Sequence, residues 1–198
     1  MAANNAARPL PHKLEPVCME PQVLLDRLIR LEEHVGELYV TFGDLSAAPA
    51  EVRFFWNCMA TDETHHAALL RRTAGLLDLL VLPPQASMEV LDRLEAKINT
   101  LEKAARQQQL GVDEAFRAAL ELEGSELNRL TAAWIRGFRL EVATLLEALL
   151  PAEEDHLRRL VEATHTFSRD RTLNQQADSL WCLFQRAGEQ QGWTKENP

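Results

Sequence analysis

The chain has 198 residues, of which 46% are hydrophobic, and a formal net charge of -9 at pH 7. This length suits a single domain with one continuous core. The acidic balance and the lack of a basic stripe argue against a nucleic-acid-binding protein. No stretch approaches the roughly eighteen apolar residues of a membrane span, and no basic segment leads into an apolar run. We therefore expect a cytoplasmic protein that does not contact a membrane.

Cysteine usage and residue types narrow the fold class. The three cysteines are far apart in the sequence and form no C-x-x-C pair. This argues against a disulfide framework and against a zinc or rubredoxin-type knuckle. Most apolar residues are Leu and Ala, which favour helix, and the alternation of Val, Ile and Thr that is typical of strands is missing. The composition predicts an all-α fold.

Six helices are predicted in one domain that covers residues 21–187. Before it, prolines among small and polar residues at 1–20 predict a flexible leader, and after it residues 188–198 are expected to fray. A charged segment at about 87–109 is expected to be a crossover helix, and an amphipathic one at about 173–187 to dock on the other helices or on a second subunit. The four main helices are predicted at about 21–46, 49–80, 113–137 and 139–167.

The helix predicted at 21–46 has one charged residue on its apolar stripe, Glu32. The neighbouring Glu33 falls on a mixed, charged face, so we choose Glu32 as the buried acid. Tyr39, the only tyrosine of the chain, lies seven residues further along the same stripe. The stripe is spaced three and four residues apart and consists of Leu25, Leu28, Glu32, Val35, Tyr39 and Phe42.

The stripe of the helix predicted at 49–80 is polar at two positions only, Glu63 and His66. Residues three apart on a helix point in similar directions, so a carboxylate and an imidazole at this spacing can bind one ion together. His65 falls off the stripe and is expected to be exposed or to support a ligand. The stripe consists of Val52, Trp56, Met59, Glu63, His66 and Leu70.

The two later helices repeat this arrangement. On the helix predicted at 113–137, Glu123 is central in the apolar stripe, and Glu126, one turn on, is close enough to be an additional ligand. The helix predicted at 139–167 carries a second Glu-x-x-His pair, Glu153 and His156. Pro151 is expected to kink that helix because it removes one backbone hydrogen bond.

Two Glu-x-x-His pairs, each about thirty residues after a Glu in an apolar stripe, predict a site for two metal ions. Carboxylates in an apolar interior lose hydration and repel one another, at a cost of several kcal/mol per ion. They must therefore be partly protonated or surround cations. Carboxylate and imidazole donors suit iron or manganese better than calcium or magnesium, and zinc also accepts them.

The order Glu, Glu-x-x-His, Glu, Glu-x-x-His over residues 21–167 resembles the ferritin-like di-iron carboxylate family, and in particular its rubrerythrin branch. Residues 31–39, Leu-Glu-Glu-His-Val-Gly-Glu-Leu-Tyr, resemble a helix of that branch in which a ligand Glu precedes a Tyr by seven residues. The segments that begin at Glu63 and Glu153 resemble its E-x-x-H-x-x-x-L helices. One departure is Leu130, which stands where the branch has a second tyrosine.

This resemblance implies a four-helix ferritin-like bundle that holds two iron ions. Glu63 and Glu153 would bridge the metals. The terminal ligands would be Glu32 and His66 on one metal, and Glu123 and His156 on the other.

The resemblance also implies a redox function, either reduction of hydrogen peroxide or oxidation of Fe(II) by oxygen or peroxide. An external electron donor is expected because the rubredoxin domain of a full rubrerythrin is missing, and a homodimer is expected with this activity. Tyr39 is the candidate catalytic residue, as a hydrogen-bond partner of a ligand or a reservoir for an oxidising equivalent; simple core packing is the alternative. Two other functions stay open: iron storage or handling, and a helical interaction protein with a vestigial metal site.

Overall fold

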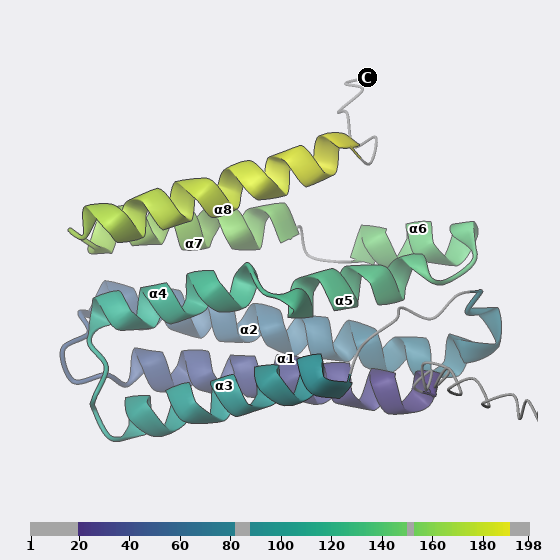
Figure 1. Ribbon diagram of the computed structural model, residues 1–198, viewed down its shortest axis with the longest axis horizontal. Helices are drawn as coiled ribbons and strands as arrows, with labels where there is room; N and C mark the ends of the chain where they lie inside the picture. The colour runs from purple at the N-terminus through teal and green to yellow at the C-terminus, as the bar shows by residue number, and fades with distance from the viewer. Residues whose placement is uncertain (1–19, 82–87, 150–152, 191–198) are drawn as a thin grey trace, which may run out of the picture.

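The computed structural model describes residues 20–81, 88–149 and 153–190, and these residues form helices with no extended strand (Figure 1). The all-α prediction is thus confirmed for them, whereas the ferritin-like bundle remains a prediction. The helices are α1 (Pro21–Gly43), α2 (Ala50–Thr73), the 3-10 helix η1 (Ala74–Leu79), α3 (Met88–Arg106), α4 (Val112–Glu123), α5 (Glu126–Arg136), α6 (Leu140–Leu149), α7 (Glu153–Phe167) and α8 (Arg171–Gln190).

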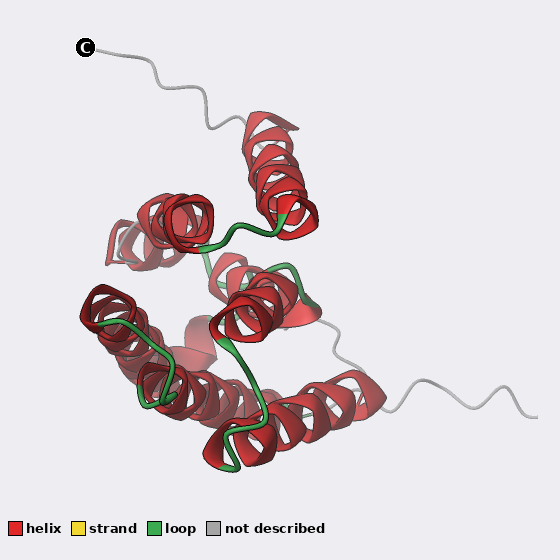
Figure 2. Ribbon diagram, turned by 90° about the vertical axis from the view of Figure 1, so that its left-hand side faces the viewer, coloured by secondary structure: helices red, strands yellow, loops and turns green. Residues whose placement is uncertain are grey.

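The helices run nearly side by side and back and forth along the long axis of the molecule. Helices α1 and α2 form a long hairpin, and α3 lies along α1. Helices α4 and α5 follow one another end to end across this hairpin, α6 and α7 do the same beyond them, and α8 lies outermost against α7 and α4 (Figures 1 and 2). Four segments, α1, α2, α4 and α7, therefore surround one stretch of the interior.

Aromatic side chains fill the core on one side of this interior stretch. Trp56 of α2 is fully buried, and its ring lies 5.3 Å from Tyr39, 5.2 Å from Phe42 and 4.9 Å from Phe116, measured between ring centroids. These contacts join α1, α2 and α4. Aromatic rings bury large apolar areas and fix their neighbours' positions, so Tyr39 is held in place by packing on this side.

One prediction that the structure contradicts is the single helix at 113–137, which is interrupted between α4 and α5. Gly124 ends α4: its N–H donates to the carbonyl oxygen of Leu120 at 3.0 Å, and the N–H of Ser125 donates to that of Leu122 at 2.9 Å. Ser125 then caps α5, because its hydroxyl accepts a hydrogen bond from the N–H of Leu127 at 3.2 Å. A Cβ atom at Gly124 would lie 3.2 Å from Cδ1 of Leu180, so the glycine also lets α8 approach.

Of the helix predicted at 139–167, the structure describes α6 up to Leu149 and α7 from Glu153, and the residues between them lie outside the described part. Pro151, for which a kink was expected, lies outside the described residues, and so do residues 1–19 of the predicted leader and 191–198 of the tail. Helix α8 continues to Gln190, three residues into the segment expected to fray. The helix predicted at 49–80 ends earlier, at Thr73, and continues as η1.

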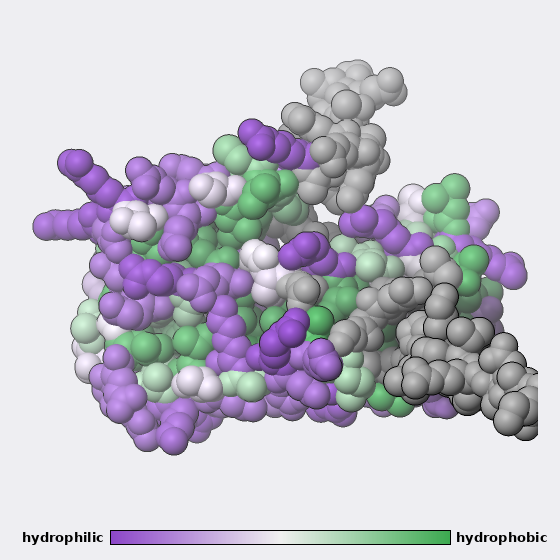
Figure 3. Space-filling model, in the orientation of Figure 1, coloured by the Kyte–Doolittle hydropathy of each residue, from purple (hydrophilic) through white to green (hydrophobic). Residues whose placement is uncertain are grey.

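The surface agrees with the amphipathic patterns of the helices. Hydrophilic side chains cover much of the face in Figure 3, and apolar side chains show in smaller areas among them. None of the helices in the described ranges combines the length and the apolar character needed to cross a membrane.

Arg27 attaches α3 to the hairpin. Its Nη1 and Nη2 atoms lie 2.7 Å from carboxylate oxygens of Asp92 and Glu95, and its side chain is only 10% exposed. We expect Arg27→Ala to lower the free energy of unfolding by about 1–2 kcal/mol, since the carboxylates are partly solvated and the lost packing of the Arg stem adds to the effect. Urea unfolding measures it, with Arg30→Ala on the exposed face of α1 as control. Equal effects of the two variants would contradict this role.

Candidate metal centre

Five of the predicted ligands meet in the interior between α1, α2, α4 and α7. All five side chains are buried, with exposed fractions from 2% to 9%. They form two groups, and within each group one ligand atom per residue lies within 4.8 Å of the others. One group consists of Glu32, Glu63 and His66, and the other of Glu63, Glu123 and His156. Glu63 belongs to both.

Glu63 connects the two groups through its two carboxylate oxygens. Its Oε2 lies 2.9 Å from Nδ1 of His66, one turn further along α2. Its Oε1 lies 3.3 Å from Nε2 of His156 on α7. The Nε2 atom of His156 is also 3.1 Å from Oε1 of Glu123. The two imidazole rings are 5.6 Å apart, so a single carboxylate reaches both.

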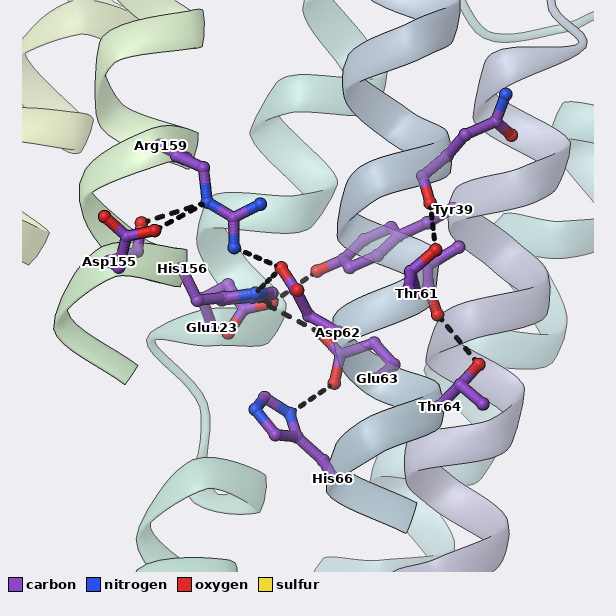
Figure 4. A network of polar contacts seen from close by, with 12 residues as sticks. Tyr39, Thr61, Asp62, Glu63, Thr64, His66, Glu123, Asp155, His156 and Arg159 are labelled. Carbon is purple, nitrogen blue, oxygen red and sulfur yellow. Dashed lines mark hydrogen bonds and ion pairs between the residues drawn. The ribbon is translucent and has the colours of Figure 1, made fainter. Parts of the chain in front are cut away.

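Hydroxyl groups hold the outer carboxylates. Thr131 of α5 donates a hydrogen bond to Oε1 of Glu32 at 2.8 Å. The Tyr39 hydroxyl donates to Oε1 of Glu123 at 2.5 Å (Figure 4). The candidate catalytic residue is therefore in direct contact with a candidate ligand. A hydrogen bond to a charged carboxylate is among the stronger ones, so Tyr39 restrains Glu123.

Asp62 orients His156 from the other side of the ring. The Oδ2 atom of Asp62 lies 3.0 Å from Nδ1 of His156 (Figure 4). The same oxygen accepts a hydrogen bond from Arg159, which lies about one turn after His156 on α7. The Nε of Arg159 lies 3.3 Å from a carboxylate oxygen of Asp155. With Nδ1 bonded to a carboxylate, Nε2 of His156 is the nitrogen that faces Glu63 and Glu123. Partners of this kind fix the ring and tautomer of metal-binding histidines.

Sequence reasoning missed three of these supporting residues, namely Asp62, Thr131 and Arg159. Their contacts cross between helices, and a stripe on one helix does not reveal them. The only signal in the sequence was the position of Asp62, directly before Glu63 at the edge of the stripe. His65, which falls off the stripe, is exposed.

Two predicted ligands stand at helix starts, and their side chains lie outside the described part of the structure. Glu126 is the first residue of α5, and Glu153 is the first residue of α7. The additional-ligand role of Glu126 and the bridging role of Glu153 stay predictions. The break after Glu123 means that Glu126 does not follow it on one continuous helix.

Burial and charge place protons on three members of the centre when no metal ion is bound. Burial, together with the charge of Glu63, raises the pKa of Glu32 to about 8. Burial alone would lower the pKa of His66, but its hydrogen bond to Glu63 and the charges of Glu63 and Glu32 outweigh this and raise it to about 9. For His156, burial is likewise outweighed, chiefly by the charge of Glu123, and its pKa stands well above the usual range.

Glu123 and Asp62 stay ionised because both face the imidazole of His156. Burial would raise the pKa of Glu123, yet the charge and hydrogen bond of His156 and the hydrogen bonds of Tyr39 and Asn128 lower it to about 2. For Asp62, burial is outweighed by His156 and Arg159, and its pKa is lowered. Burial and the charge of Glu123 raise the pKa of Tyr39 well above its ordinary value, so its hydroxyl remains a donor.

The buried donors fit a metal ion. Two polar atoms of the centre, Oε1 of Glu63 and Nε2 of His66, have no hydrogen-bond partner in the structure although they are buried. Buried polar atoms without partners are rare and call for an explanation such as a bound ion. Oxygen and imidazole donors in one cluster suit iron, manganese or zinc. These buried Glu and His groups could bind a metal ion.

Comparison with known proteins identifies no relative of this chain. No protein-family model, no curated protein and no solved structure matches the chain.

The pKa values predict how stability depends on pH in protein stripped of metal. Glu32 titrates near 4.5 when unfolded and about 8 when folded, and His66 near 6.5 and about 9. Folding therefore takes up protons, and these two contributions are lost as pH rises from about 5 to 9. We expect the melting temperature in chelator to fall by about 5 °C or more between pH 5.5 and 9.

Two variants test whether Glu32 causes this pH dependence. Glu32→Gln should reduce the fall because the side chain no longer titrates, whereas Glu33→Gln, at the neighbouring position on α1, should not. A melting temperature that is constant or rises over this range, or equal slopes in the two variants, would contradict the assignment.

Proposed function

We propose that the protein is a rubrerythrin-like member of the ferritin-like superfamily that binds two iron ions in this centre and acts as an oxidoreductase. Its substrate would be hydrogen peroxide or oxygen, in peroxide reduction or in oxidation of Fe(II). Manganese or zinc could replace iron in the same donor set. The observation that supports this proposal best is Glu63, a buried carboxylate shared by two Glu, Glu, His groups.

Charge supports two cations at this place. Glu123 is ionised, and Glu32 would ionise when a cation replaces its proton. The two imidazoles would become neutral ligands in the same step. Two divalent cations would then balance the carboxylates of Glu32, Glu63, Glu123 and Glu153, and we propose the Glu153 side chain as a second bridge.

Iron is the favoured metal because two iron ions with a shared carboxylate can together give two electrons to one substrate molecule. Hydrogen peroxide takes up two electrons and two protons and yields two water molecules. The sequence carries no C-x-x-C pair, so we propose that a separate donor protein returns the electrons. A homodimer is part of this proposal.

The chain's own residues would position the ligands and exclude water. Thr131 would keep Oε1 of Glu32 directed into the centre, and Tyr39 would do the same for Glu123. Asp62 would keep a proton on Nδ1 of His156 so that Nε2 is the free donor. The Tyr39 hydroxyl contacts Glu123, so Tyr39 is placed to receive an oxidising equivalent from the centre. The ring of Trp56 lies 5.3 Å from that of Tyr39, so Trp56 could receive it in turn.

A second candidate is a helical protein in which the centre is a structural polar network. It is favoured by the charges without metal: the ionised Glu123 and Asp62 face the protonated His156, and Glu32 is neutral. No cation is then needed beside His156, although Oε1 of Glu63 and Nε2 of His66 are left without hydrogen-bond partners. Metal binding therefore separates the two candidates.

Anaerobic iron loading followed by stoichiometric peroxide tests the proposed function. The chain should bind two Fe(II) ions and then develop the absorption of an oxidised, oxygen-bridged iron pair. His66→Ala should reduce the bound iron to about one ion per chain, because that ligand group loses its nitrogen donor. His65→Ala, an exposed neighbour, is the matched control and should retain both ions. Iron bound without a spectral change would reject the redox function.

Metal uptake should also release protons. At pH 7 the three protonated groups, Glu32, His66 and His156, would each give up a proton, so we expect about three protons per chain loaded with two metals. Titration calorimetry with zinc in buffers of different ionisation enthalpy measures this number. Apparent affinity should fall as pH is lowered. A release below one proton would contradict the proton inventory of the centre.

A further inference from the structure

The side-chain amide of Asn128 contacts Glu123 at two different acceptors. Its Nδ2 atom lies 2.8 Å from Oε2 of the Glu123 carboxylate and 3.2 Å from the Glu123 main-chain carbonyl oxygen. Both partners can only accept hydrogen bonds, so the group that faces them must be the NH2 group, which has two protons to donate. One amide group thus joins the backbone and the side chain of a candidate ligand.

These contacts complete the surroundings of the Glu123 carboxylate. Its Oε1 atom is contacted by the Tyr39 hydroxyl at 2.5 Å and by Nε2 of His156 at 3.1 Å. Its Oε2 atom is contacted by Asn128. The oxygen nearest to His156 is therefore Oε1, and Asn128 holds the opposite oxygen. A carboxylate restrained at both oxygens cannot rotate about its last bond without losing a hydrogen bond.

The break between α4 and α5 makes this arrangement possible. In a continuous α-helix, residues five apart point about 140° away from each other, so Asn128 would not reach the Glu123 carboxylate. The carbonyl of Glu123 would instead accept from the N–H of Leu127. Here that N–H is bonded to the hydroxyl of Ser125, and the Asn128 amide takes its place at the carbonyl.

We propose that Asn128 is a positioning residue that holds Glu123 with Oε1 directed at His156, and that the Gly124–Ser125 break is what lets Asn128 reach it. As to metal binding, this inference rests on the proposed function. The orientation of the Glu123 carboxylate itself does not depend on a metal, because the structure already defines it by three contacts. The two parts can be tested separately.

Tyr39, the single tyrosine of the chain, reports directly on the orientation of the Glu123 carboxylate. Protein labelled with 13C at the tyrosine Cζ position gives one signal, from Tyr39, whose shift depends on its hydrogen bond to Glu123. In metal-stripped protein, Asn128→Ala should shift this signal because Glu123 is free to reorient. Asn128→Ser, which is too short to bridge both acceptors, should do the same and serves if the alanine variant does not fold.

Arg129→Ala, at the exposed neighbouring position of α5, is the matched control. It leaves the Asn128 amide and the Ser125 cap in place. If Asn128 acts on Glu123, the Arg129→Ala signal should stay at the position of the unaltered chain. If the Tyr39 signal does not move in the Asn128 variants, or moves as far in Arg129→Ala, the positioning role is overturned.

Titration with cobalt(II) alone tests the consequence for metal binding. In Asn128→Ala, one of two equivalents should bind about 10–100-fold more weakly, as is typical when a partner of a ligand is removed, and the other should be unchanged. Unchanged affinity for both equivalents would overturn this consequence. If the unaltered chain binds no cobalt, the proposed function fails, and the Tyr39 signal still decides whether Asn128 positions Glu123.

Discussion

Glu63 is the carboxylate on which the arrangement of the helices around the centre depends. It lies in the interior at 3% exposure, and it contacts one histidine of its own helix and one of α7. A buried carboxylate without partners would cost several kcal/mol, and the two imidazoles that face Glu63 offset this cost. The neighbouring residue on α2, Asp62, binds the other nitrogen of His156. Two consecutive residues of α2 thus fix the position of α7.

Helical periodicity predicted which acids and histidines face inward. It separated Glu32 from Glu33 and His66 from His65, and in the structure the first of each pair is buried and the second is partly or fully exposed. This works because a side chain's direction on a helix is set by its position alone. The all-α class followed from composition, because Leu and Ala favour helix at any position. Contacts across helices, such as that of Arg159 with Asp62, depend on packing and could not be predicted from one stripe.

The interruption between α4 and α5 was hidden by the apolar stripe. Phe116, Glu123, Leu127 and Trp134 stay in phase with one helix, yet the chain pauses at Gly124 and Ser125. The local signal, a glycine followed by a good helix cap, was weaker than the periodic one. Whether such a pair ends a helix is decided by what packs beside it, and here Leu180 of α8 occupies the space that a larger residue at 124 would need.

The proposed function gives the centre two charge states with the same side chains, one balanced by protons and one by metal ions. The difference is best tested by anomalous X-ray diffraction, at the iron edge, from crystals loaded with Fe(II) without oxygen. The account predicts two peaks in the interior, one among Glu32, Glu63 and His66 and one among Glu63, Glu123 and His156. Iron found only at surface carboxylates, or no peak beside Glu63, would contradict it.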